Sequence, residues 1–459
     1  MELLKTVKRV FFVTALSIVL FACATKSDVY KDIDKGITGG NYDNALAFIV
    51  KGQENTKKPI YPAKNAIMLY LDKGIIEHYA GKYKDSAQDL EEAERLIQEA
   101  YTKSVTADIT SYIANDNTKD YPGEDYEDLY INVFSSLNYY HQGDLEGAGV
   151  EIRKLTEKLV SLSDKYASGG SKVIDWLKTQ LDGSINPVFP KGKPVNFSNS
   201  ALARYLSAII YRGEGEADHA RIDFVELTKA YAAAPAIYST PLPASLKVSG
   251  EPGYETNEEL SISQGKARLN VIGFAGLAPV KEEGLFTDDF SFLKYSDLQT
   301  PTFKIPIIVK RPSTVSRIEV TINGGNTFNL DLLEDMGAVM EEAYNAKFTS
   351  VFFKTYIRTL IKYVAADAAA QAAQDKAPAA LGPKAGAAAA VGAKKTADAT
   401  EGADIRSGRY FPDKAFVGGV TLDPGTYTIT LNFGTEKVTL ENVKVEAGKL
   451  NLVEAVSLK

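Results

Sequence analysis

The chain has 459 residues, 45% of them hydrophobic, and a formal net charge of −7. This acidic balance, without a basic cluster, argues against a nucleic-acid partner. The single cysteine excludes intramolecular disulfides and thiolate metal sites, and the length predicts about three domains.

The N-terminal residues have the pattern of an export signal. Lys5, Lys8 and Arg9 precede an apolar run at residues 10–22, and Cys23 follows at once. This run is shorter than the roughly 20 apolar residues that a membrane-spanning helix needs. We therefore expect a signal peptide over residues 1–22 and no transmembrane span in the mature chain.

The segment LFAC, residues 20–23, resembles the bacterial lipobox, with Phe21 where that motif has a small residue. The resemblance implies that Cys23 becomes the first mature residue and is acylated, so that residues 23–37 form a lipidated tether. Two or more acyl chains anchor a protein stably. Ala24, directly after the cysteine, provides no Asp-type retention cue, so we expect an outer-membrane location if the organism has an outer membrane. The alternative is an incidental cysteine in an ordinary signal peptide.

Residues 38–240 are expected to form helical hairpins. The clearest pattern, in residues 70–93, resembles the tetratricopeptide repeat (TPR), in which small residues let two antiparallel helices approach closely. Its second half recurs at irregular intervals, which indicates a TPR-like array rather than a regular one. Gly81 should occupy a turn with positive φ. The residues that define the motif are Tyr70, Gly74, Gly81, Tyr83, Leu90, Ala93, Gly143, Ala148, Gly215 and Ala220.

The second half of the chain contains short apolar segments bounded by Gly, Pro and Asn, which indicate strands. We expect a β-rich region over 241–330, helices over 331–364, and an antiparallel β unit over 403–459. The predicted fold class is α+β multidomain, with a TPR-like α-helical hairpin array followed by a β-sandwich-like region. Strands from 257–325 would complete the sandwich, with the helices inserted between them.

An alanine-rich segment occupies residues 365–402. Alanine favours helix but offers little area to bury, so we expect a mobile linker or a marginal helical hairpin. A membrane-inserted hairpin is disfavoured, because the longest wholly apolar run, AGAAAAVGA, is too short to cross a bilayer.

Several segments together resemble a family of uncharacterised bacterial lipoproteins with an N-terminal TPR-like region and a C-terminal β region. They are PGEDYEDLYINVFSSLNYYHQGDLEGAGVEIRK, NSALARYLSAIIYRGEG, GFAGLAPVKEE, FKTYIRTLIKYVA and TEGADIRSGRYFPDKAF. In ADIRSGRYFP the chain departs from the family, which tends to have Trp after the Ser and Leu before the Pro. The resemblance implies a location in the envelope beside other lipoproteins, and it implies no assigned activity.

The sequence offers little that points to chemistry. His78, His141 and His219 are isolated near predicted turns and lack metal-motif spacing, so exposed or capping roles are expected. No nucleophile elbow, phosphate loop or dinucleotide fingerprint occurs. We therefore predict no catalytic, cofactor-binding or metal-binding residues. Glu127 and Arg153 are candidates for a partner-binding groove, with an inter-helix salt bridge as the alternative.

These observations predict a non-enzymatic lipoprotein anchored through Cys23, which acts as an interaction or assembly scaffold for other envelope proteins. The TPR-like array would present a concave partner surface. One alternative is a hydrolase of an envelope polymer, which would need two facing carboxylates in a cleft. Another is a carbohydrate-binding surface lipoprotein that uses the β region.

Overall fold

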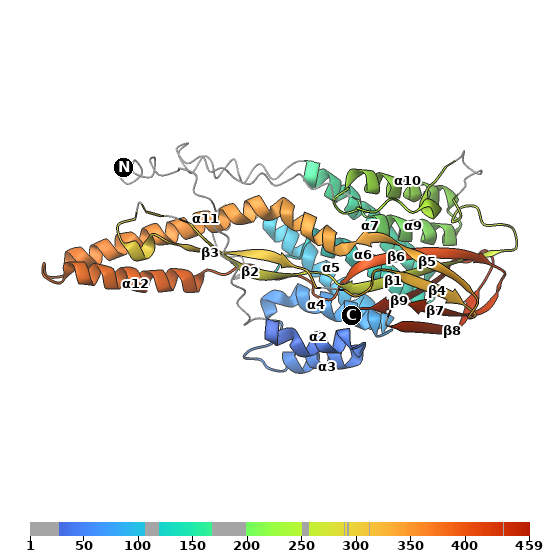
Figure 1. The fold of residues 1–459 in the computed structure, drawn as a ribbon, viewed down its shortest axis with the longest axis horizontal. Coiled ribbons are helices and arrows are strands. Elements are labelled where there is room, and N and C mark those ends of the chain that lie inside the picture. The colour runs from blue at the N-terminus through green and yellow to red at the C-terminus, as the bar shows by residue number, and fades with distance from the viewer. Residues whose placement is uncertain are drawn as a thin grey trace.

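The computed structural model describes residues 27–105, 119–167, 199–249 and 257–459, apart from the single positions 289, 292, 312 and 435. The predicted signal peptide and Cys23 lie outside the described residues. The chain is mixed α+β, with helices through its first half and a curled sheet in its second half (Figure 1).

The first half is built from antiparallel helical hairpins, and each hairpin packs on the next. Short 3₁₀ turns, Ser27–Tyr30 and Ala63–Asn65, precede the first and second hairpins. The helices are α2 (Lys31–Thr38) with α3 (Tyr42–Gln53), α4 (Ala66–Tyr79) with α5 (Tyr83–Val105), α6 (Asp125–His141) with α7 (Leu145–Ala167), and α9 (Ala201–Glu214) with α10 (Ala217–Ala233).

The predicted turn glycines lie between the paired helices. Gly40, Gly81, Gly143 and Gly215 have φ of +70°, +71°, +79° and +86°, a region that other residues enter at a steric cost. The positive φ predicted for Gly81 is therefore confirmed. Within the second hairpin, a β-carbon at Gly74 would lie 2.8 Å from the Leu90 side chain, so only glycine allows this approach.

The remaining motif residues lie on the same hairpins. Leu90, Ala93, Ala148 and Ala220 are buried between helices, whereas Tyr70 and Tyr83 are half-buried. These positions establish close-packed helical hairpins, and the finer TPR-like arrangement remains a prediction.

The second half forms one seven-stranded sheet in the order β8-β7-β4-β5-β6-β1-β9, with a separate two-stranded ribbon, β2-β3. The strands are β1 (Ala267–Leu277), β2 (Val280–Thr287), β3 (Thr302–Val309), β4 (Ile318–Ile322), β5 (Asn326–Asp335), β6 (Pro412–Leu422), β7 (Gly425–Asn432), β8 (Lys437–Val445) and β9 (Asn451–Ser457). Strands on both sides of the inserted helices share the sheet, as predicted.

The predicted sandwich and the separate antiparallel C-terminal unit are corrected. The edge strands β8 and β9 contact each other, so the sheet curls on itself. Strand β9 runs parallel to β1, while β6 pairs with both β1 and β5. Successive residues of β1 serve different cores: Val271 lies inside the curl, and Ile272 faces the helices. The curled sheet therefore encloses one of its own faces, whereas in a sandwich a second sheet covers that face.

The alanine-rich segment is a helical hairpin rather than a linker. Helix α11 (Met336–Lys376) and α12 (Gly382–Thr400) pack side by side and project from the body as an arm (Figure 1). The predicted helices begin at residue 336 because residues 331–335 belong to β5. Small side chains such as Ala370 and Ala390 are fully buried between the two helices. The helices therefore pack closely, and the hairpin forms although each alanine buries little area. No helix in the described ranges is long and apolar enough to span a bilayer.

Candidate functional site: a cationic cleft

An extended segment, residues 402–411, crosses the face of the helical array formed by α2, α4 and α6; we call it the connector. The Gly408 N–H donates to Glu127 Oε1 at 2.6 Å, and the Arg409 N–H donates to Asp72 Oδ1 at 2.6 Å. The Tyr410 hydroxyl donates to Asp34 at 3.0 Å. The array thus binds an extended piece of its own chain through backbone N–H groups.

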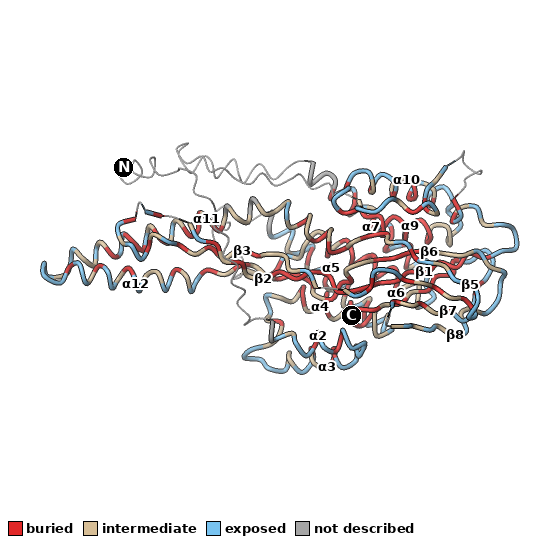
Figure 2. Tube along the Cα trace, viewed as in Figure 1, coloured by how far each residue is buried: buried red, intermediate tan, exposed pale blue. Residues whose placement is uncertain are grey.

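The face of the array that carries the connector is also covered by the sheet. Phe134 of α6 packs on Phe274 of β1 with ring centroids 5.3 Å apart, and the Tyr130 hydroxyl donates to Glu334 of β5 at 2.6 Å. Figure 2 shows buried residues along α6 and β1 and in the middle of β6. This face of the array is therefore not open to a partner protein.

Glu127 is a structural capping residue rather than a partner-facing one, which corrects the sequence interpretation. Its side chain accepts the Glu124 N–H at 2.9 Å in a capping box and the Tyr121 hydroxyl at 2.8 Å. Arg153 is exposed on α7. The structure does not bring these two residues together.

Burial raises the pKa values of the two carboxyls that accept backbone N–H groups of the connector. The pKa of Asp72 and that of Glu127 rise to about 7, because desolvation outweighs the hydrogen bonds donated by the connector N–H groups. Both groups are buried and hydrogen-bonded within the fold.

A cleft of about 610 Å³ opens beside the connector, between the array, the β2-β3 ribbon and the base of the arm. Its volume lies within the range of small-molecule sites, roughly 300–1,000 Å³. Its cationic lining residues are Lys64, Lys103, Lys119, Lys281, Lys304, Lys347, Lys354, Arg358 and Arg406, and its acidic ones are Glu99, Asp120, Glu124 and Asp404. We call this the cationic cleft.

Positive charge exceeds negative charge in the cationic cleft even when carboxylates behind it are counted. Nine cationic residues face four acidic ones among the described residues that line it. Three further carboxylates, Asp125, Glu283 and Glu401, pair with Lys347, Lys304 and Arg358 at 3.7, 3.3 and 2.9 Å. Among the described residues, an excess of two positive charges remains.

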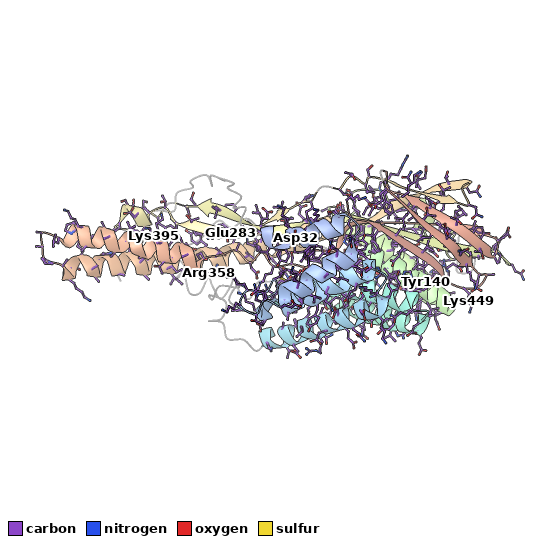
Figure 3. The ribbon with its side chains drawn as sticks, turned by 90° about the horizontal axis from the view of Figure 1, so that it is seen from below. Asp32, Tyr140, Glu283, Arg358, Lys395 and Lys449 are labelled. Atoms are coloured by element: carbon purple, nitrogen blue, oxygen red, sulfur yellow. The ribbon has the colours of Figure 1, made fainter. Side chains whose placement is uncertain are left out.

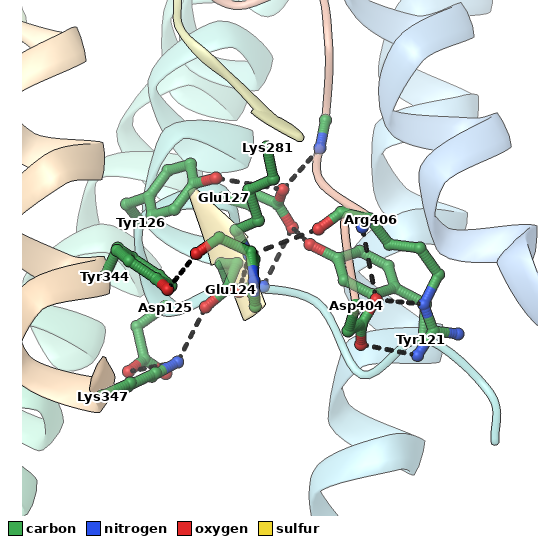
Figure 4. Close-up of polar contacts among 12 residues, drawn as sticks. Tyr121, Glu124, Asp125, Tyr126, Glu127, Lys281, Tyr344, Lys347, Asp404 and Arg406 are labelled. Atoms are coloured by element: carbon green, nitrogen blue, oxygen red, sulfur yellow. Dashed lines mark hydrogen bonds and ion pairs between the residues drawn. The ribbon is translucent and has the colours of Figure 1, made fainter. Parts of the chain in front are cut away.

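Glu124 organises the cationic side chains on one side of the cleft (Figure 4). It pairs with Lys281 of β2 and, at 2.8 Å, with Lys347 of α11. Burial alone would raise its pKa, but these two ammonium groups outweigh burial and hold the pKa well below 4.5. Glu124 is therefore ionised, and it joins α6, the ribbon and the arm at the cleft.

The cationic cleft is lined by apolar and charged side chains together. Ile67, Tyr126 and Met340 are buried, and so are Lys281, Arg358 and Arg406, whereas Lys64 and Lys103 are exposed. A ligand in this cleft would meet hydrocarbon and aromatic surface together with ammonium and guanidinium groups.

The expected exposure of the histidines is wrong for two of the three. His78 is buried and His141 is largely covered; their Nε2 atoms lie 3.0 and 2.8 Å from Glu454 Oε1 of β9. His219 is exposed, as predicted, beside Glu216. Among the described residues, no group of three metal-ligating side chains converges on a point.

Sequence reasoning missed the cationic cleft because its charges are dispersed over residues 64–406 and form no local cluster. The chain has no match among known family models, curated proteins or solved structures at the level of similarity that would indicate kinship.

Proposed function

We propose that this protein is a membrane-anchored, non-enzymatic interaction protein of the bacterial envelope, which binds an anionic group of its partner in the cationic cleft. One observation carries the proposal: positive side chains converge on an apolar cavity in a chain whose net charge is −7. Such a cavity focuses positive potential and selects anionic groups. The anchor is the acylated Cys23 expected from the sequence.

The arrangement of carboxylates favours binding over polymer hydrolysis. A hydrolase would need a proton donor with a raised pKa facing a second carboxylate across a cleft. Asp72 and Glu127, with pKa values raised to about 7, are instead hydrogen-bonded to the connector inside the fold. In the cleft, Glu124 has a lowered pKa and pairs with lysines.

An acidic peptide tests the proposal. Fluorescein-labelled octaglutamate is titrated with the mature chain, and binding is measured by fluorescence anisotropy at two salt concentrations. We expect salt-dependent binding that weakens about tenfold in the Lys103→Glu/Lys354→Glu double variant, because two attractive charges become repulsive.

The matched control is the Lys437→Glu/Lys449→Glu double variant, which makes the same charge change at exposed residues of β8 and the β8-β9 turn. Its affinity should equal that of the wild type. Equal losses in both double variants would show a general charge effect and contradict a specific site in the cleft.

A further inference from the structure

We infer that the occupant of the cationic cleft is an acidic lipid of the membrane that anchors the chain, an inference that rests on the proposed anion-binding role of the cleft. The headgroup would lie among the cationic side chains, and the first part of an acyl chain would lie on the half-buried apolar side chains of the lining.

The composition of the cleft matches an amphiphile better than a simple anion. An inorganic phosphate needs only donors and positive charge, and it leaves hydrocarbon walls uncovered. Here Leu96, Tyr344 and Val351 line the cavity and are only half-buried, so they present apolar surface to it. A volume of about 610 Å³ also exceeds what one phosphate group fills.

The expected anchor brings the membrane to this part of the molecule. Three residues separate Cys23 from Ser27, where the described chain begins, and the four steps from Cys23 to Ser27 span at most about 14 Å. The chain then places Tyr30 against Tyr61, with ring centroids 5.7 Å apart. Two residues beyond Tyr61, the chain reaches the cleft lining at Ala63.

A backbone hydrogen bond joins the segment that follows Tyr61 to another segment of the cleft lining. The Lys64 carbonyl accepts the Tyr121 N–H at 2.7 Å, and both residues line the cavity. In Figure 3, Asp32 of α2, Glu283 of β2 and Arg358 of α11 all lie between Lys395 in the arm and Lys449 at the opposite end. The anchored end of the chain and the elements around the cleft therefore share the middle part of the molecule.

Charge gives the cleft a specific role at a membrane. A chain with net charge −7 is repelled as a whole by an acidic lipid surface. Lysines close to such a surface attract it over short range. The cationic cleft is where the described surface offers an acidic lipid both attraction and an apolar cavity.

Vesicle co-sedimentation tests this inference. The full mature chain carrying Cys23→Ala, and therefore lacking acyl groups, is mixed with vesicles of phosphatidylcholine alone or with an equal part of phosphatidylglycerol. We expect binding only to the phosphatidylglycerol vesicles. The Lys103→Glu/Lys354→Glu variant should bind about tenfold more weakly, and the Lys437→Glu/Lys449→Glu variant should bind as the wild type does.

A cavity-filling variant separates occupation of the cleft from attraction to the surface. Val351→Trp fills the cavity without changing charge and should also weaken vesicle binding. Circular dichroism shows whether this variant folds. If it does not fold, Ala100→Phe, in the same cavity, is used instead. Two results would overturn the inference. One is unchanged vesicle binding by a folded cavity-filling variant, and the other is an affinity for soluble glycerol 3-phosphate equal to that for phosphatidylglycerol vesicles.

The failures of the two proposals are distinguishable. If octaglutamate binds in the cleft while phosphatidylglycerol vesicles do not, the lipid inference is wrong and the proposed anion-binding function stands. If neither probe binds, both are wrong.

Discussion

At the scale of single residues, a chain of buried hydrogen bonds determines the protonation state of His78. The Ser86 hydroxyl donates its one proton to the Gly74 carbonyl at 2.7 Å, so it must accept from Asn138 Nδ2 at 2.8 Å. Asn138 Oδ1 then faces His78 Nδ1 at 2.8 Å, and the Glu454 carboxylate faces Nε2 at 3.0 Å. Both ring nitrogens face acceptors, so His78 is an imidazolium.

The electrostatics of this pair agree with the hydrogen-bond geometry. Burial would lower the pKa of His78, but Glu454 and Asn138 outweigh it and raise the pKa above 6.5. Burial would raise the pKa of Glu454, but His78 and His141 hold it well below 4.5. The interaction between His78 and Glu454 therefore stabilises the fold fully between pH 4.5 and pH 6.5, the ordinary pKa values of the two groups. This stabilisation is lost as the pH rises through the folded-state pKa of His78, or as the pH falls through the folded-state pKa of Glu454.

We predict that His78→Gln lowers the free energy of unfolding by about 3 kcal/mol near pH 6, because it leaves a buried carboxylate with a weaker partner. The difference from wild type should be smaller at about pH 9 than at pH 6, because the stabilisation is lost as pH rises through the raised pKa of His78. Urea denaturation of both proteins at the two pH values measures this. Asp72 and Glu127, with pKa values of about 7, also make stability depend on pH, but they do so equally in the wild type and the variant. The difference in stability between the two proteins therefore excludes their contribution.

The control for this prediction is His219→Gln, since the His219 side chain is 59% exposed. It should change stability little at either pH. A His78→Gln effect that stays constant from pH 6 to pH 9 would show that His78 contributes by packing alone.

At the scale of elements, the arm shows how two alanine-rich helices remain paired. The Tyr295 hydroxyl donates to Gln374 of α11 at 2.8 Å, while α12 passes over it at Gly386. Near the base, Glu401 accepts from Arg358 at 2.9 Å and pairs with Lys362 at 2.6 Å. Specific contacts of this kind supplement the small area that alanine buries.

We predict that Gly386→Leu separates α12 from α11, because a side chain at this position would overlap the Tyr295 hydroxyl. Overpacking of this kind costs about 1–3 kcal/mol, so amide hydrogen exchange in α12 should accelerate about tenfold or more. The rest of the molecule should exchange as before.

Gly392→Leu on the same helix is the matched control, since a β-carbon there meets no atom within 4 Å. Equal exchange rates in the two variants would show that the contact between Tyr295 and Gly386 does not hold the hairpin together.

At the scale of the whole molecule, the two halves interlock. Strands β1, β4 and β5 precede the arm and β6–β9 follow it, yet all seven belong to one sheet. The connector between the arm and β6 binds α4 and α6 through Asp72 and Glu127. The helical and β regions therefore share a hydrophobic core, rather than forming the separate domains that the sequence suggests.

The predicted lipid anchor also belongs to the scale of the whole molecule, because it would decide where the cationic cleft is held. We predict that Cys23→Ala transfers the protein from the membrane fraction to the soluble envelope fraction, since acylation needs the thiol. Fractionation and immunoblotting measure the transfer. Ser27→Ala, four residues further on, should leave the protein in the membrane, and membrane retention of Cys23→Ala would refute the lipid anchor.

The sequence by itself determined the features that depend on neighbouring residues. The helical hairpins, their glycine turns and the alternating strands follow from local periodicity and from the backbone freedom of Gly81 and its counterparts. The export signal and Cys23 are likewise local patterns, and they remain predictions.

Only the tertiary structure decided the features that join distant residues. The parallel pairing of β9 with β1, the hairpin packing of the alanine-rich helices, and the buried roles of His78 and Glu127 depend on partners far along the chain. The cationic cleft collects side chains between Lys64 and Arg406. No local pattern encodes such a site, because its field depends on distances in space that sequence separation does not measure.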